Sequence, residues 1–308
     1  MSRASRLALT VSCFVVALGL VGCGSASAPA TTGAAASTGA AASLGSNVSH
    51  FTVRTPEGRV RSYIVYAPPG GAKNSPLVLV YHGAEGTAEG TAKETDFVQV
   101  AAQKGIVVAF LQGYEDTWNE GAGHTPAEVA GVNDVQFTSA ALSQIESRYS
   151  IDRTRIAATG FSNGALLTEL LGCRLAQRLT LVAPVAGQLP VSVSSTCSPS
   201  RPISVLELHG TADRSIPYTG GHFVGVGGGT TVLSAPANAA RWASLNGCAK
   251  QSNTTDSALA TVLTTYSACR DRVVVQLRTL QGAGHGWPSD VGVLIAEFLQ
   301  EHPGTPAS

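Results

Sequence analysis

Residues 156–164, IAATGFSNG, join two different kinds of sequence pattern. Ile156 opens a short run typical of a buried strand, and residues 165–174 after the stretch have the pattern of a helix. Gly160 and Gly164 flank Ser162, and a sharp strand-to-helix turn of this composition leaves its central side chain exposed. The Gly-x-Ser-x-Gly motif is weak alone in a chain with 34 glycines, but this position makes Ser162 a candidate nucleophile.

Short apolar runs alternate with helix-like segments on both sides of Ser162. The run 77–81 (LVLVY) is apolar throughout, as a strand buried on both faces must be. Such alternation predicts an α/β fold, with a mostly parallel central sheet, helices on both faces and ligands beyond the carboxyl ends of the strands. The Gly-rich residues 220–229 are expected to form a long, flexible loop near the site. The expected strands are residues 51–54, 61–67, 77–81, 106–111, 156–159, 181–185, 203–208 and 273–280, with the first two antiparallel, and the expected helices are residues 91–103, 135–149, 165–174, 237–245 and 291–299.

Asp213 and His285 follow Ser162 in the chain, each just beyond an expected strand. A histidine can take the proton of a serine hydroxyl, and a carboxylate can hold that imidazole in the required tautomer. The order serine, aspartate, histidine is that of the α/β-hydrolase fold, which places all three at one edge of the sheet. The sequence therefore predicts this fold, with Ser162, Asp213 and His285 as catalytic triad. Little or no lid is expected, because no long segment is available for one between residues 181 and 213.

A glycine-rich turn, residues 81–86 (YHGAEG), follows the first buried strand and offers free backbone N–H groups. We expect the N–H groups of Ala84 and Asn163 to form an oxyanion hole, which stabilises the charge that develops during acyl transfer. Trp287, close to the expected catalytic histidine, and Trp118 are expected to line an acyl or aromatic pocket.

Other candidate residues have weaker positions. Glu115, Asp116 and Asp134 could each supply a carboxylate, but they precede the serine and break the expected order. His82 and His209 each precede a glycine at the end of a strand and are expected to orient loops. An isolated aspartate in such a loop more often makes an Asx turn. A triad is favoured because Ser162, Asp213 and His285 occur in the expected order and each follows a strand.

The N-terminus has the pattern of an export signal. Arg3 and Arg6 precede an apolar run, residues 7–20, that is too short to span a membrane comfortably. The run ends in Leu20-Val21-Gly22-Cys23, which resembles the bacterial lipobox, where the cysteine receives a diacylglycerol and becomes the mature N-terminus. We therefore predict a lipid anchor on Cys23; the alternative is an ordinary cleaved signal peptide.

These patterns divide the chain into three parts. Residues 1–22 are the expected lipoprotein signal peptide, residues 23–46 a disordered tether rich in Ala, Ser, Thr and Gly, and residues 47–303 the catalytic domain. The expected location is the outer face of the bacterial cell membrane or the cell envelope, where the membrane itself is a partner through the lipid.

Four of the six cysteines lie in the expected domain: Cys173, Cys197, Cys248 and Cys269. Four cysteines in an exported domain suggest two disulfides, for which three pairings exist. The sequence-local pairs Cys173–Cys197 and Cys248–Cys269 are favoured; the alternative is that one pair stays reduced and buried.

The charge and motif content exclude several classes of partner. Twenty basic and 20 acidic side chains give a formal net charge of +0, without a run of like charges, so no nucleic-acid partner is expected. No phosphate-cradling Gly loop opens a βαβ unit, so no organic cofactor is expected. No Cys/His cluster has the spacing of zinc ligands, so no metal is expected either.

The motifs together resemble those of the poly(3-hydroxybutyrate) depolymerase-like esterases, a group that overlaps the secreted feruloyl and acetyl-xylan esterases. The resemblance covers about residues 51–299 and implies Ser162 as nucleophile, Asp213 as acid and His285 as base. The cysteine positions are also familiar from this group and support the favoured pairing. The blocks that carry the resemblance are His82-Gly83-Ala84, residues 160–164, residues 209–213 with Pro217 and Gly220-Gly221, and residues 284–288.

Two departures from this group concern substrate choice. Asn133-Asp134 stands where a paired Asp-Asp is frequent, and Ala84-Glu85-Gly86 stands where a small or Cys-Gly-Gly sequence is common. The expected function is that of a serine esterase acting through an acyl-enzyme on short-chain, hydroxyalkanoate or phenolic esters, small or polymeric. The rival hypotheses are a non-catalytic surface-binding lipoprotein on the same fold, and an acyltransferase or peptidase.

Overall fold

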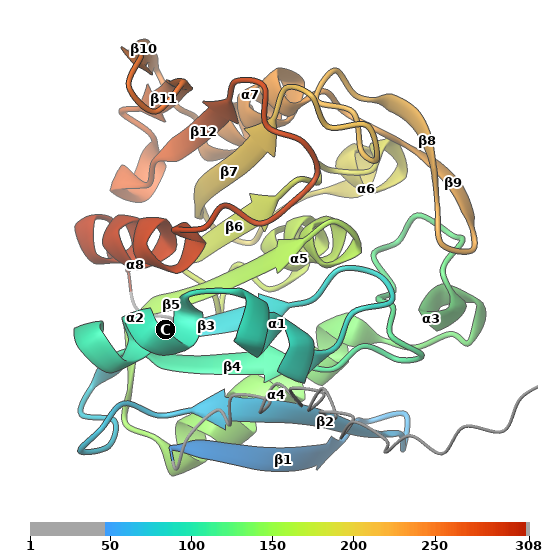
Figure 1. Cartoon of the computed structure of the whole chain (residues 1–308), viewed down its shortest axis with the longest axis vertical. Coiled ribbons are helices and arrows are strands. Elements are labelled where there is room, and N and C mark those ends of the chain that lie inside the picture. The colour runs from blue at the N-terminus through green and yellow to red at the C-terminus, as the bar shows by residue number, and fades with distance from the viewer. Residues whose placement is uncertain (1–46, 306–308) are drawn as a thin grey trace, which may run out of the picture. The chain divides into compact units, whose positions relative to one another are not determined.

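Ten strands among residues 47–305, the part of the chain that the computed structural model describes, form one sheet. Their order across the sheet is β1-β2-β4-β3-β5-β6-β7-β12-β11-β10 (Figure 1). The predicted signal peptide, the lipid site Cys23 and the predicted tether lie outside the described residues.

The strands of this sheet are β1 (Val48–Arg54), β2 (Val60–Tyr66), β3 (Ser75–Tyr81), β4 (Val107–Leu111), β5 (Ile151–Phe161), β6 (Leu181–Val185), β7 (Ser204–Gly210), β10 (Lys250–Asp256), β11 (Thr261–Ser267) and β12 (Val275–Leu280). A separate hairpin consists of β8 (Gly221–Gly225) and β9 (Gly228–Val232). The helices are α1 (Ala88–Glu94), α2 (Phe97–Lys104), α3 (Pro126–Val129), α4 (Asp134–Arg148), α5 (Asn163–Arg174), α6 (Val191–Thr196), α7 (Ala235–Asn246) and α8 (Val291–Glu301), with one 3-10 turn, η1 (Arg270–Arg272).

The centre of the sheet is parallel. β4, β3, β5, β6, β7 and β12 pair in that order with the same direction, while antiparallel strands lie at both sides. All five residues of β4 and of β6 are buried, which explains why these strands are apolar throughout rather than alternating. The carboxyl ends of six strands therefore meet at one edge of the sheet, as the sequence predicts.

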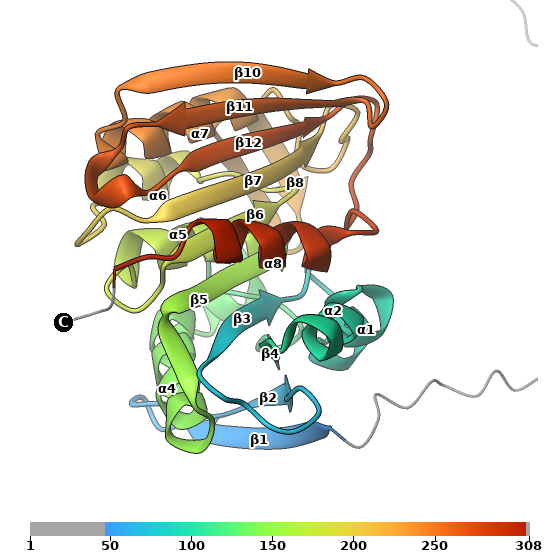
Figure 2. The same ribbon diagram turned by 90° about the vertical axis from the view of Figure 1, so that its left-hand side faces the viewer.

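Helices cover both faces of this sheet (Figure 2). On one face α4, α5 and α7 bury Leu142, Leu167 and Trp242 in a single apolar core. On the other face α1, α2 and α8 form a second core, with Phe97 and Ile295 among its residues. The predicted α/β-hydrolase architecture of a mostly parallel sheet between helix layers is confirmed.

Three elements differ from expectation. The expected helix 91–103 is two helices, α1 and α2, because Thr95 takes an extended conformation and its hydroxyl donates to the Thr91 carbonyl. The expected loop 220–229 contains the hairpin β8–β9. The hairpin β10–β11 is not predicted from the sequence, because β10 is exposed and polar over its whole length and has no apolar alternation.

Both favoured disulfides are present. Cys173 at the end of α5 bonds Cys197 beyond α6, and Cys248 after α7 bonds Cys269 before η1. In the described part of the chain, no helix has the length and apolarity needed to cross a membrane.

Candidate active site

Ser162 lies at the sharp turn between β5 and α5, with φ 55° and ψ −118°. Such a backbone conformation is strained for a residue with a side chain, and strain of this kind costs about 1–3 kcal/mol. Its two flanking glycines are required by close packing: a Cβ on Gly160 would lie 2.3 Å from the Gly164 carbonyl oxygen, and a Cβ on Gly164 would lie 2.5 Å from the His82 carbonyl oxygen. The local sequence thus fixes a partly exposed serine just beyond the carboxyl end of β5.

Asp213 and His285 come together at the same edge, beyond β7 and β12. His285 Nδ1 lies 2.7 Å from Asp213 Oδ2, and the Asp213 side chain is fully buried. The other carboxylate oxygen accepts the backbone N–H groups of Ser215 at 2.8 Å and Ile216 at 3.0 Å. Because this carboxylate accepts the Nδ1–H of His285, the Nε2 atom of the ring is left to accept a proton.

His209 supports the same carboxylate. Its Nε2 lies 3.3 Å from Asp213 Oδ2 and 3.0 Å from the Ile216 carbonyl oxygen, and both are acceptors, so Nε2 carries the proton. Burial alone would raise the pKa of Asp213, but the hydrogen bonds from His209 and His285 and the positive charge of a protonated His285 hold that pKa well below its usual range. Asp213 is therefore a permanent anion beside His285.

Ser162 and His285 line one pocket of about 350 Å³. Ala84 and Asn163, the expected oxyanion-hole residues, line it too. Within residues 47–305 no backbone hydrogen bond uses the N–H of Ala84 or of Asn163, so both groups are available to an incoming oxygen. The Asn163 side chain is held separately, because its Oδ1 accepts the Trp118 backbone N–H at 2.8 Å.

The structure does not put the two expected tryptophans in this pocket. Trp118 is fully buried, donates its indole N–H to the His82 carbonyl oxygen at 2.8 Å and packs edge-on against Tyr81. It supports the turn that carries Ala84 instead of contacting substrate, which corrects the expectation. Trp287 lines a separate hollow of about 250 Å³ with His285 and packs on Phe161, 5.5 Å between ring centroids.

Two further groups line the pocket, of which the sequence places the first near the site, as a loop, and misses the second. The first is the β8–β9 hairpin, which contributes Phe223 and residues 224–226. The second is the segment before α3, which contributes Glu120 and His124. Burial, and then the nearby charge of Glu128, raise the pKa of Glu120 well above its usual range. The spacing Glu120-x3-His124-x3-Glu128 was the available sequence pattern for this second group.

Two of the three alternative acids, Asp134 and Asp116, have other partners. Asp134 forms a buried ion pair with Arg61 at 2.7 Å and accepts the Asn119 backbone N–H at 2.8 Å. Asp116 accepts the Gln112 side-chain amide at 2.9 Å. Among these carboxylates only Asp213 contacts His285 in the described residues.

Comparison with known proteins agrees with this fold. The family model described as phospholipase/carboxylesterase matches residues 70–224, about half of the chain. Feruloyl esterase B of Piromyces equi is 33% identical over 234 residues, which are 73% of this chain and 42% of that protein. A bifunctional acetylxylan esterase/xylanase of Neocallimastix patriciarum is 30% identical over 162 residues, 53% of this chain and 23% of that protein.

Two solved structures share the fold at low sequence identity. An acetyl xylan esterase from Aspergillus awamori superposes with a TM-score of 0.61 at 16% identity, covering 82% of this chain and 99% of that one. A feruloyl esterase module from Clostridium thermocellum, complexed with sinapinate, gives 0.53 at 13% identity and covers 82% and 86%.

The sheet order and the serine turn define the class of protein as an α/β-hydrolase. The chain belongs to the phospholipase/carboxylesterase family. It spans less than half the length of the two curated relatives named above.

Proposed function

We propose that this chain hydrolyses carboxylic esters through an acyl-enzyme formed on Ser162. The observation that carries the proposal is the shared pocket of Ser162 and His285, with Asp213 bonded to the far side of the imidazole. In this mechanism His285 Nε2 takes the hydroxyl proton while Ser162 Oγ attacks the ester carbonyl carbon. The N–H groups of Ala84 and Asn163 stabilise the oxyanion.

The second half of the reaction uses the same groups. The imidazolium of His285 returns its proton to the leaving alcohol, which departs and leaves an acyl group on Ser162. A water molecule then gives a proton to His285 and attacks the acyl carbon; His285 passes that proton to Ser162 Oγ as the carboxylic acid leaves, which restores the free hydroxyl. The buried anion of Asp213 stabilises the imidazolium in both halves.

The lining of the pocket favours esters with an apolar acyl part. Leu166, Ile216 and Phe223 supply apolar side chains, and the volume of about 350 Å³ suits a short acyl or single aromatic group. We propose short-chain, hydroxyalkanoate or feruloyl-type esters as substrates. Feruloyl and acetylxylan esterase activities appear among the names of its relatives, which supports this range.

Turnover of p-nitrophenyl acetate, p-nitrophenyl butyrate and methyl ferulate tests the activity. Ser162→Ala should abolish all three, while Ser147→Ala should leave them unchanged, because Ser147 is an exposed serine on α4 whose hydroxyl bonds only the neighbouring Gln144 carbonyl and Arg148 side chain. Equal turnover by wild type and Ser162→Ala would refute the acyl-enzyme. A folded, disulfide-bonded protein that hydrolyses none of the three would favour a binding module on the same fold.

The export and anchoring of the chain are a separate part of the proposal. We propose that residues 1–22 are removed as a lipoprotein signal peptide, that Cys23 carries the lipid and that residues 23–46 tether the catalytic domain, residues 47–303. The two disulfides support an oxidising location. The wild-type protein should partition into the detergent phase, and Cys23→Ser should stay in the aqueous phase. Partitioning of Cys23→Ser into the detergent phase would refute the lipid site.

A further inference from the structure

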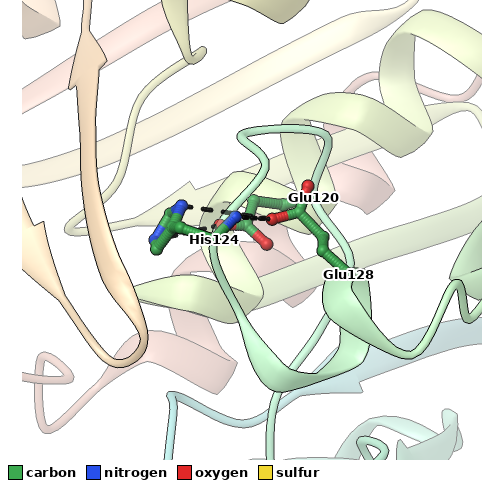
Figure 3. Close-up of side chains that lie close together, drawn as sticks. All are labelled: Glu120, His124 and Glu128. Atoms are coloured by element: carbon green, nitrogen blue, oxygen red, sulfur yellow. Dashed lines mark hydrogen bonds and ion pairs between the residues drawn. The ribbon is translucent and has the colours of Figure 1, made fainter.

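Three side chains with metal-binding atoms converge at one wall of the substrate pocket (Figure 3). Glu120 and His124 lie in the segment before α3, and Glu128 lies within α3. One ligand atom from each of the three lies within 4.8 Å of the other two. Glu120 and His124 also line the pocket that contains Ser162, so the cluster meets the site where substrate is expected.

The cluster is rich in buried polar atoms that have no partner. Both carboxylate oxygens of Glu120 and Nδ1 of His124 are buried without a hydrogen bond in the described part of the chain. Nine such atoms occur in the described part of the chain, and three of the nine belong to Glu120 and His124. Leaving a buried acceptor unsatisfied costs about 1–3 kcal/mol, and more when the group is charged. A bound cation would satisfy both oxygens of the Glu120 carboxylate, whose side chain is 0% exposed.

An ion pair inside the cluster does not account for this arrangement. His124 Nε2 lies 3.8 Å from Glu120 Oε1, and His124 Nδ1 lies 4.0 Å from Glu128 Oε2, both too long for a hydrogen bond. A tetrahedral zinc ion with bonds of about 2.1 Å holds its ligand atoms about 3.4 Å apart. The three donors thus need to close by little more than 1 Å, a shift within reach of side-chain rotation.

Glu128 is already held in the orientation that a ligand needs. Its Oε2 accepts the backbone N–H groups of Gly123 and His124 at 2.6 Å, and of Thr125 at 3.3 Å, as part of a capping box on α3. Hydrogen bonds of this kind to a ligating carboxylate fix its geometry and raise metal affinity. The other oxygen, Oε1, has no hydrogen bond within residues 47–305.

The segment that carries His124 is also fixed by the neighbouring hairpin. A Cβ on Gly227 would lie 2.2 Å from the His124 carbonyl oxygen, and a Cβ on Gly228 would lie 3.0 Å from His124 Cβ, so the turn between β8 and β9 packs directly on this residue. His124 is consequently held between the hairpin and the two glutamates.

We propose that Glu120, His124 and Glu128 bind one divalent cation of the zinc class at the wall of the substrate pocket. Two carboxylates and a neutral imidazole neutralise its charge, and three protein ligands leave a further position for water or a substrate oxygen. This proposal reverses the expectation of no metal, which considered only Cys/His spacings. It goes beyond ester hydrolysis and does not depend on it.

Zinc titration of the purified, oxidised protein, prepared without a polyhistidine tag, tests the site. Isothermal calorimetry with zinc chloride should give one site per chain in the wild type, and Co²⁺ should give a visible absorption band typical of low coordination number. Glu120→Gln and His124→Asn should each weaken zinc binding by about tenfold or more and remove the cobalt band. The matched controls are Glu89→Gln and His222→Asn, which are exposed and outside the cluster, and both should bind as wild type does.

Folding does not obscure this test. Glu120→Gln removes a buried carboxylate without a partner, so its melting temperature in the absence of metal should equal or exceed that of the wild type. At a fixed zinc concentration the rise in melting temperature should be smaller for Glu120→Gln than for the wild type and the controls. Absence of zinc binding by the wild type at millimolar metal, or binding that persists in both cluster variants, would overturn the proposal.

Discussion

Asp213→Asn is the substitution that examines the proposed catalytic geometry most closely. The asparagine can keep one oxygen in place to accept the N–H groups of Ser215 and Ile216. Its amide nitrogen then faces His285 Nδ1, where the carboxylate oxygen lay at 2.7 Å. An N–H group cannot accept a proton from the ring, so the imidazole is forced to carry its proton on Nε2, the atom that must take the proton of Ser162.

The expected loss is large and confined to turnover. A wrong imidazole tautomer lowers kcat by about 10⁴-fold, and at 1.36 kcal/mol per tenfold this is about 5 kcal/mol of transition-state stabilisation. KM should change little, because Asp213 is buried and does not contact the substrate pocket. The assay is steady-state hydrolysis of p-nitrophenyl butyrate, with wild type and variant compared at the same pH.

Asp256→Asn is the matched control. Asp256 makes the same local turn, since its Oδ1 accepts the backbone N–H groups of Ala258 at 3.0 Å and Leu259 at 3.1 Å, but it lies on the exposed strand β10. It should keep wild-type kcat. A loss of less than tenfold in Asp213→Asn, or an equal loss in both variants, would refute the assignment of Asp213.

Three further predictions concern stability, each measured by urea unfolding with the disulfides intact. Ser162→Gly should raise the free energy of unfolding by about 1 kcal/mol, because glycine relieves the strained backbone at φ 55°, whereas Ser162→Ala should not; equal values would contradict the strain. Arg61→Met should lower the free energy of unfolding by about 3–5 kcal/mol, because it leaves the buried carboxylate of Asp134 uncompensated; a change below about 1 kcal/mol would show that the pair is not buried in solution. Burial raises the pKa of Glu169 from 4.5 to about 7, so between these pH values the folded state retains a proton that the unfolded state has lost. The free energy of unfolding should therefore fall by at most about 3 kcal/mol as the pH rises from 4.5 to 7. Glu169→Gln should flatten this pH dependence, and an unchanged slope would assign it to other groups.

The sequence predicts those features of the fold that depend on local pattern. The parallel strands were found because burial on both faces makes them apolar throughout, as in β6. Ser162, Asp213 and His285 can be predicted as a triad because each follows such a strand, and parallel strands bring their carboxyl ends to one edge. The cysteine pairing was favoured because the partners lie close in the chain, 24 and 21 residues apart.

Features that depend on tertiary packing were missed. The hairpin β8–β9 has a Gly-rich sequence typical of a loop, and its strands are set by cross-strand pairing rather than by apolar alternation. Trp118 was expected at the pocket because aromatic side chains favour both cores and binding sites. Its fully buried position follows from packing against Tyr81 and His82, which no local pattern encodes.

The metal-ligand cluster illustrates the same limit. Glu120, His124 and Glu128 have a regular spacing, yet regular spacing in a loop does not by itself bring side chains together. Their convergence depends on the capping box of α3 and on the glycines of the hairpin turn, which lie about 100 residues further along the chain.

Covalent labelling of the nucleophile tests the central claim most directly. The protein is treated with diethyl p-nitrophenyl phosphate, and the modified residue is mapped by peptide mass spectrometry alongside the residual hydrolysis of p-nitrophenyl butyrate. The acyl-enzyme mechanism predicts one phosphoryl group per chain on Ser162, with activity lost in proportion to labelling and no label in Ser162→Ala. Stoichiometric labelling of another residue, or full activity in a protein labelled at Ser162, would contradict it.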